Sequence, residues 1–240
     1  AGIAQLSAQS GYRTFVREVD EETVRKGLHR IEGSLASGVE RGKLSSATKE
    51  ATMSNLIGTT SLEKMAECDL VIEAIVEDLT AKQEVFSALE AIVRPETVFA
   101  SNTSSLCITE MASGTSRPDR FIGLHFFSPV PVMKLVEVIR GLATSDETYK
   151  QIFAFGETLG KEPVTAPDRP GFIANRLLIP YLLDAVRAYE CGVGTIEDID
   201  KTMSLGCGHP MGPFTLLDFI GIDTTYYIAN IMYDEFRTSN

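Results

Sequence analysis

The order of apolar and polar positions predicts strands that alternate with helices over the first two thirds of the chain. Short apolar and β-branched runs, typical of strands, occupy residues 12–18, 56–59, 69–76 and 98–101. Residues 1–9, 21–41 and 80–93 carry their apolar side chains at helical spacing. The run at 69–76 is almost continuously apolar, which predicts a strand covered on both faces of a parallel sheet. The alternation predicts a doubly wound, Rossmann-like α/β domain whose ligands bind beyond the carboxyl ends of the strands.

The pattern changes after Pro163. Residues 166–170 read Ala-Pro-Asp-Arg-Pro, and this proline-containing stretch interrupts regular structure. Residues 171–189 and 195–204 then have helical patterns. We therefore predict a boundary near Asp168, with an α/β domain over residues 1–168 and an all-helical domain over residues 169–240.

Composition and charge narrow the class of partner. The net charge of −11 disfavours nucleic-acid binding, which relies on clustered Lys and Arg, and no apolar stretch has the roughly 20 residues of a membrane span. An acidic ligand would need a local basic patch. The four cysteines form no CxxC pair, so we expect neither a metal site nor a disulfide framework, and a reducing cytoplasm fits best.

Glu18 stands at the end of the first predicted strand. A Rossmann domain places there the carboxylate that binds the ribose hydroxyls of NAD and repels the 2′-phosphate of NADP. Taken alone, however, an acidic residue after a strand is more often a solvated turn residue.

His125 and Glu137 lie twelve residues apart, each inside an apolar run. Titratable side chains seldom enter such runs without partners. A carboxylate beside an imidazole fixes its tautomer and stabilises the imidazolium, which makes a general base for oxidising an alcohol. The alternative is a buried structural histidine and an unrelated glutamate, and the pattern alone leaves both open.

Several longer segments resemble the L-3-hydroxyacyl-CoA dehydrogenase family, particularly its short-chain 3-hydroxybutyryl-CoA members. The most distinctive is His-Phe-Phe-Ser-Pro-Val-Pro-Val-Met-Lys-Leu-Val-Glu-Val at residues 125–138. Other matching segments, in the family's order, are residues 69–77, 100–106, 170–178 and 209–213. The resemblance covers essentially the whole chain. At Ser128 it departs from the family, which most often has Asn there.

The resemblance implies a set of catalytic residues. His125 would be the general base and Glu137 its orienting carboxylate. Ser104 would hydrogen-bond the region of the substrate's 3-oxygen, and Asn175 would help to hold the acyl-CoA and the dyad. Without the resemblance, we would interpret Ser104 as a turn cap and Asn175 as an ordinary helix residue.

The resemblance also implies cofactor and substrate contacts. It assigns Glu18 to the adenine ribose of NAD, Asn102 and Ser104 to the nicotinamide end, and Glu77 and Lys82 to the nicotinamide ribose and neighbouring groups. Arg41 and Lys43 lie where family members have basic residues near the CoA phosphates, although a solvated helix end explains them equally well. The other histidines, His29 and His209, match no catalytic position, and we expect structural or surface roles for them.

The family's usual first strand and GxGxxG turn have no counterpart in these 240 residues. That strand is the central one, so we expect the strands containing Val16 and Val71 to lack a partner between them. Without the turn that binds pyrophosphate at a helix N-terminus, we expect these 240 residues to bind NAD poorly. Family members also continue, beyond the position of Asn240, into a last helical segment.

We predict reversible, NAD-dependent oxidation of an L-3-hydroxyacyl-CoA, with 3-hydroxybutyryl-CoA as the favoured substrate, to 3-ketoacyl-CoA. The implied setting is fatty-acid β-oxidation or butyrate-type metabolism, and the family forms homodimers through its helical domain. One alternative is a sugar-acid (gulonate-type) dehydrogenase of the same fold. Another is a non-catalytic module for acyl-CoA binding or dimerisation, which NAD titration would distinguish from an enzyme.

Overall fold

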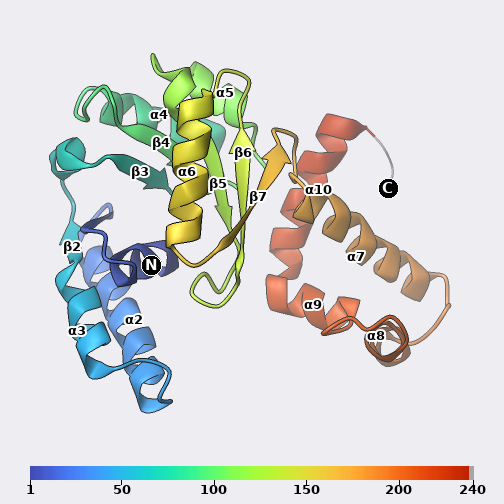
Figure 1. Cartoon of the computed structure of the whole chain (residues 1–240). Helices are drawn as coiled ribbons and strands as arrows, with labels where there is room; N and C mark the ends of the chain where they lie inside the picture. Colours follow the sequence, from blue (N-terminus) through green and yellow to red (C-terminus); the bar gives the residue numbers. More distant parts are fainter. Residues whose placement is uncertain (238–240) are drawn as a thin grey trace. The chain divides into compact units, whose positions relative to one another are not determined.

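The chain divides into two units in the computed structural model, which describes residues 1–237 (Figure 1). The first unit holds residues 1–103 and 108–166, and the second holds residues 104–107 together with residues from 167 onward. Chain order alone offers no reason to expect that residues 104–107, which closely follow the fourth strand, belong to the second unit.

The first unit alternates strands and helices, as the apolar pattern predicts for its first hundred residues. Its strands are β1 (Thr14–Arg17), β2 (Leu56–Thr59), β3 (Leu70–Glu73), β4 (Val98–Ser101), β5 (Phe121–Phe126), β6 (Leu135–Arg140) and β7 (Glu162–Pro167), the last ending at the boundary. Its α-helices are α1 (Gly2–Gln9), α2 (Glu21–Glu40), α3 (Ser46–Ser54), α4 (Leu79–Glu90), α5 (Ile108–Ser113) and α6 (Asp146–Thr158). Two 3₁₀ helices, η1 (Leu62–Glu67) and η2 (Pro118–Arg120), complete it.

The strands form two sheets. β1 and β2 pair in parallel as one sheet, and the other has the order β3-β4-β5-β6-β7. β3, β4 and β5 run parallel, and β6 is antiparallel to β5. Among the described residues no ladder joins β1 to β3, which are the strands that contain Val16 and Val71. The expectation that these two strands lack a partner between them is therefore confirmed.

The prediction was wrong in the extent of β3 and incomplete elsewhere. The apolar run at 69–76 does not form one fully covered strand: β3 ends at Glu73, its first three residues are only half-buried, and Ile75 and Val76 are exposed. β3 lies at an edge of its sheet, which leaves it less covered than a central strand. The apolar pattern did not predict β5, β6, β7, α3, α5 or α6. In β7 the mostly exposed residues show little apolar alternation.

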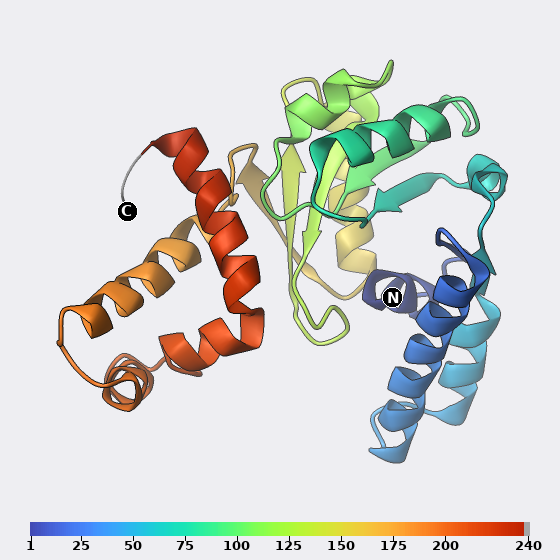
Figure 2. The same ribbon diagram turned by 180° about the vertical axis from the view of Figure 1, so that it is seen from behind.

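Helices pack on both faces of the five-stranded sheet. α6 lies over one face, and α4 and α5 lie over the other (Figures 1 and 2). On the first face, Leu6 and Ile152 join Ile122, Leu124 and other alternate strand residues in one buried cluster. On the second face, the rings of Phe86, Phe99 and Phe121 contact one another.

Gly123 explains how closely α5 approaches this second face. A Cβ atom at Gly123 would lie 2.8 Å from Ile108 and 2.9 Å from Ile139. Residues 121, 123 and 125 alternate onto the same face of β5. The side chain of His125 therefore belongs to the face that α4 and α5 cover.

The second unit contains α7 (Ala174–Glu190), α8 (Ile196–Gly206), α9 (Pro213–Ile220) and α10 (Ile222–Phe236). Ile179 of α7 packs against Ile228 and Met232 of α10. Asp200 of α8 caps the start of α9, because its carboxylate accepts hydrogen bonds from the backbone N–H groups of Phe214 and Thr215. No helix among residues 1–237 combines the length and the apolar character needed to cross a bilayer.

Candidate active site at the carboxyl ends of the strands

The parallel strands β3, β4 and β5 end at a common edge of the sheet. Their last residues are Glu73, Ser101 and Phe126. Ligands of doubly wound sheets bind beyond this edge. The predicted residues Glu77, Lys82, Asn102 and His125 all belong to these strand ends or to the segments that follow them.

His125 and Glu137 face each other across the β5–β6 pair. They occupy the same register position, and Nδ1 of His125 lies 2.8 Å from Oε2 of Glu137. Both residues are buried, with 7% and 1% of their surface exposed. The ring of Phe127 lies against the imidazole, with 4.5 Å between ring centroids. The geometry thus favours an imidazole–carboxylate pair over two unrelated residues.

This contact determines which nitrogen can take up a proton. A carboxylate can only accept, so Nδ1 must carry a hydrogen and donate a hydrogen bond to Glu137. In the neutral ring, Nε2 then holds the lone pair. When Nε2 accepts a proton, the positive charge forms beside Glu137, in surroundings where an unpaired charge would be costly. The pair therefore has the chemistry of a general base.

Asn102 connects the end of β4 to the end of β5. Its Oδ1 accepts a hydrogen bond from the backbone N–H of Phe126 at 2.9 Å. Because that partner can only donate, the orientation of the amide is fixed, and its NH₂ group turns away from Phe126. Asn102 therefore holds the backbone next to His125, and its side-chain NH₂ donor points away from that backbone.

Glu73, Glu77 and Lys82 form a charged cluster beside these strand ends. Nζ of Lys82 lies 2.7 Å from Glu73 and 3.2 Å from Glu77. The side chains of Lys82 and Glu73 are each 1% exposed, whereas that of Glu77 is 22% exposed. Sequence reasoning missed Glu73, although it is an acidic residue inside an apolar run, which is the signal that singled out Glu137.

Glu18 follows β1 directly. Its side chain is half-buried, and its backbone N–H continues the β1–β2 ladder by donating to the carbonyl oxygen of Thr59. Glu18 thus lies at the carboxyl end of a parallel strand, where a ribose-binding carboxylate is expected.

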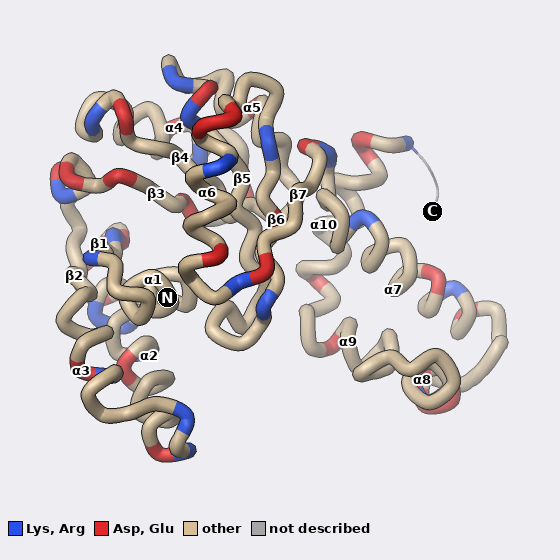
Figure 3. The backbone as a smooth tube through the Cα atoms, viewed as in Figure 1, with Lys and Arg blue, Asp and Glu red and all other residues tan. Residues whose placement is uncertain are grey.

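Arg41 and Lys43 lie at the turn between α2 and α3, a basic tip marked in blue in Figure 3. Both side chains are exposed, and neither forms an ion pair with any residue in the described part of the chain. A helix tip with unpaired cations is available to an anion, but nothing in its local structure fixes the position of one.

Ser104 and Asn175 both belong to the second unit, where the structure brings them together. Nδ2 of Asn175, in the first turn of α7, donates to the backbone carbonyl oxygen of Ser104 at 3.4 Å. Asn175 therefore helps to fix the segment of residues 104–107 to the helical unit.

The two remaining histidines differ in their surroundings. His29 is exposed on α2, and His209 is half-buried with Nδ1 3.1 Å from the hydroxyl of Tyr181. Burial raises the pKa of Tyr181, and nearby Cys207 and Asp200 add to the rise.

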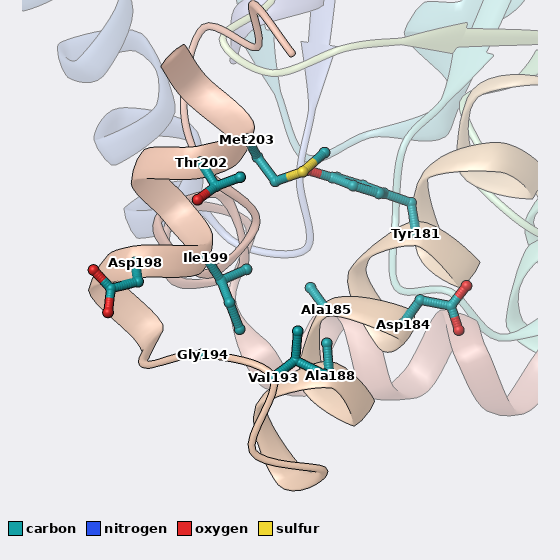
Figure 4. A pocket seen from close by; sticks show the side chains of 10 residues that line it. All are labelled: Tyr181, Asp184, Ala185, Ala188, Val193, Gly194, Asp198, Ile199, Thr202 and Met203. Atoms are coloured by element: carbon teal, nitrogen blue, oxygen red, sulfur yellow. The ribbon is translucent and has the colours of Figure 1, made fainter. Parts of the chain in front are cut away.

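Tyr181 also lines a cavity of about 440 Å³ between α7 and α8 (Figure 4). Its wall is mainly apolar, and the carboxylates of Asp184 and Asp198 point away from its centre. None of the residues predicted to be catalytic or to bind ligands lines this cavity.

Comparisons with known proteins match both units. The family model described as "3-hydroxyacyl-CoA dehydrogenase, NAD binding domain" matches residues 1–169, and that described as "3-hydroxyacyl-CoA dehydrogenase, C-terminal domain" matches residues 171–240. The chain is 48% identical to the mitochondrial hydroxyacyl-coenzyme A dehydrogenase of Homo sapiens over 96% of this chain and 75% of that protein. It is 46% identical to a probable 3-hydroxybutyryl-CoA dehydrogenase of Deinococcus radiodurans over 99% of this chain and 87% of that protein.

A solved structure agrees. The crystal structure of (S)-3-hydroxybutyryl-CoA dehydrogenase from Ralstonia eutropha superposes with a TM-score of 0.96 at 41% identity. The match covers 99% of this chain and 84% of that one.

Proposed function

The chain belongs to the 3-hydroxyacyl-CoA dehydrogenase family of NAD-dependent oxidoreductases, and from this premise we propose that it converts L-3-hydroxybutyryl-CoA to the 3-keto product. The preference for a four-carbon acyl group is supported by relatives named as 3-hydroxybutyryl-CoA dehydrogenases. Fatty-acid β-oxidation or butyrate-type metabolism is the setting that fits this reaction.

The residues at the strand ends fit a dinucleotide. Glu18 offers a half-buried carboxylate at the end of a parallel strand for the adenine ribose, and Glu77 offers a partly exposed carboxylate for the nicotinamide ribose. Asn102 turns an amide donor away from its own backbone partner, which suits the nicotinamide carboxamide. When bound, NAD supplies the acceptor for the hydride that leaves C3 of the substrate. Lys82 is buried between two carboxylates, so its effect on the cofactor would pass through Glu77.

His125 takes the hydroxyl proton as the C3 carbon loses its hydride. The proton moves to Nε2, the C–O bond becomes a carbonyl, and the resulting imidazolium is stabilised by Glu137 through Nδ1. In the reverse direction the same proton returns to the oxygen. This pair is the observation that carries the proposal, because it provides a buried base that is already in the required tautomer.

Ser104, Asn175, Arg41 and Lys43 would act on the substrate. The Ser104 hydroxyl would donate to the 3-oxygen, while Asn175 would hold the Ser104 backbone and contact the acyl-CoA. Arg41 and Lys43 would attract the CoA phosphates, which would otherwise be repelled by a protein of net charge −11.

The test is a steady-state assay of the native full-length protein. We expect NAD-dependent oxidation of L-3-hydroxybutyryl-CoA, followed by the absorbance of NADH, and far lower kcat/KM with gulonate. Efficient oxidation of gulonate without activity on the acyl-CoA would favour the sugar-acid alternative. Acyl-CoA binding without NAD binding would favour the non-catalytic alternative.

We also propose that the protein is a homodimer formed through its helical unit. Leu205, Phe219, Ile222 and Tyr226 are each more than 60% exposed there, and such large apolar side chains are typical of interfaces. Sedimentation should give twice the monomer mass at micromolar concentration, and a monomer under those conditions would contradict the proposal.

A cytoplasmic location completes the proposed function. All four cysteines are free thiols, as a reducing compartment favours. Fractionation of the native cells should recover the protein with cytoplasmic markers, and recovery with an organelle or the medium would contradict this.

A further inference from the structure

Glu73 is a buried carboxylate with a full set of donors. Its Oε1 accepts hydrogen bonds from Nζ of Lys82 at 2.7 Å and from the backbone N–H of Ile75 at 2.6 Å. Its Oε2 accepts from the hydroxyl of Ser101 at 2.6 Å. Glu73 is thus fixed by the end of β4, by the segment after β3 and by α4, and it has no direct route to a ligand.

Lys82 links Glu73 to the more exposed Glu77. The ammonium group lies closer to Glu73, at 2.7 Å, than to Glu77, at 3.2 Å. Since Lys82 is 1% exposed, water cannot solvate its charge, and the two carboxylates must share it. The position of Lys82 therefore sets how much of the positive charge Glu77 receives.

The cluster carries two carboxylates and one ammonium group, so its net charge is negative. Its most exposed member is Glu77, whose Oε1 also accepts from the hydroxyl of Thr103. A charged acceptor forms stronger hydrogen bonds with hydroxyl groups than a neutralised one does. Glu73 draws Lys82 away from Glu77, and Glu77 is therefore a stronger hydrogen-bond acceptor than it would be if it alone paired with Lys82.

We propose that Glu73 is a positioning residue for the cofactor: it holds Lys82 so that Glu77 keeps its negative charge for the hydroxyl groups of the nicotinamide ribose. The inference rests on the proposed function, which assigns Glu77 to that ribose. Glu73 would thus influence the affinity for NAD without contacting NAD.

The experiment compares NAD dissociation constants, measured by calorimetry, in the native full-length protein. With Glu73→Gln, Lys82 is left with Glu77 as its one carboxylate and neutralises it, so NAD binding should weaken about five- to tenfold. The double variant Glu73→Gln with Lys82→Met removes both buried charges and leaves Glu77 negative. It should therefore bind NAD more tightly than Glu73→Gln does.

This recovery separates positioning from a merely structural role. If the cluster only stabilised the fold, removing a second member would weaken binding further, and a double variant that binds NAD more weakly than Glu73→Gln would overturn the proposal. Should Glu73→Gln fail to fold, Glu73→Asp takes its place: the shorter side chain keeps the charge but holds Lys82 less closely, so NAD should bind more weakly, and wild-type affinity would overturn the proposal.

Glu90→Gln is the matched control. Glu90 ends the same helix, α4, and accepts from the backbone and hydroxyl of Ser116 and from Nε of Arg117. Its loss should lower the melting temperature without changing NAD affinity. Equal affinities in the wild type and in Glu73→Gln would overturn the inference alone, whereas a wild type that does not bind NAD would overturn the proposed function with it.

Discussion

The carboxyl edge of the five-stranded sheet and the region around β1, α2 and α3 both carry charged residues that we assign to ligand binding, but they hold them differently. At the carboxyl edge of the sheet, His125, Glu137 and Glu73 are buried and fixed by partners at hydrogen-bond distance. In the other region, Glu18 is half-buried, and Arg41 and Lys43 are exposed and unpaired among the described residues.

This difference predicts how strongly each region responds to mutation. A buried charge interacts through a low effective dielectric and is already oriented, whereas an exposed charge is screened by water and salt. Substitutions of His125 or Glu137 should therefore alter the chemical step, and those in the other region should alter affinity and selectivity by smaller factors.

The largest effect is expected at the dyad. In the native full-length protein, His125→Ala should lower kcat by about 10² to 10⁴, with a similar or smaller loss for Glu137→Gln, which keeps the shape but removes the charge. The two losses should not multiply, because Glu137 has no proton transfer to assist once His125 is absent. The measurement is steady-state oxidation of 3-hydroxybutyryl-CoA, with circular dichroism to check folding. Multiplicative losses in a folded double variant would show that the residues do not act as a pair.

Asn102 should show an intermediate effect. Asn102→Ala removes the acceptor for the backbone N–H of Phe126 as well as the outward amide donor, and we expect kcat/KM to fall about tenfold. Asn102→Asp keeps the acceptor and loses the donor, so it should retain the wild-type melting temperature but not full NAD affinity. Wild-type kinetics in both variants would mean that Asn102 contacts neither the cofactor nor anything the reaction needs.

Glu18 should affect the choice of cofactor more than the rate. In Glu18→Ala, loss of a charge-assisted contact to the ribose hydroxyls should weaken NAD binding about tenfold. Without the repulsion between Glu18 and the 2′-phosphate, the affinity for NADP relative to NAD should rise at the same time. Dissociation constants for both cofactors test this, and an unchanged ratio would identify Glu18 as a solvated turn residue.

The smallest effect is expected at the basic tip. Exposed charges contribute little each, so replacing both Arg41 and Lys43 by Gln should raise KM for the acyl-CoA by a factor of about three to ten. The increase should shrink at high salt, with kcat unchanged. Lys26→Gln, an exposed lysine on α2 that pairs with Glu22, is the control. An increase in KM that salt does not alter would contradict a role in attracting the CoA phosphates.

Features that depend on a local pattern could be predicted from the sequence, whereas features that depend on pairing between segments could not. The strands at 56–59 and 98–101 agree with β2 and β4 residue for residue, because short apolar runs between polar turns have few alternatives. His125 and Glu137 could be singled out because titratable groups inside apolar runs need partners. Their separation in space could not be derived from that pattern, since it depends on the antiparallel register of β5 and β6.

Other features depended on contacts between distant segments. The burial of Lys82 could not be predicted, because a lysine on an amphipathic helix is usually exposed, and Glu73, which holds it, comes from another element. The strand β7 could not be predicted, because it pairs in the sheet although its own residues show little apolar pattern. The placement of residues 104–107 with the helical unit likewise depends on contacts such as that of Asn175 with Ser104.

The β5–β6 register has a consequence for recognising distant relatives. In the β5–β6 hairpin the pairs run from Gly123 with Ile139 to Phe126 with Val136, so each step forward along β5 is a step back along β6. His125 therefore pairs with Glu137. The twelve-residue separation is therefore a property of the connecting loop and not of the chemistry. A longer or shorter loop that preserved the pairing would present the same two side chains to each other, whereas a slip of one residue would move one of them to the opposite face. Relatives with altered loops would thus be missed by a search for this spacing, but found by a search for a histidine and a glutamate that pair across two buried antiparallel strands.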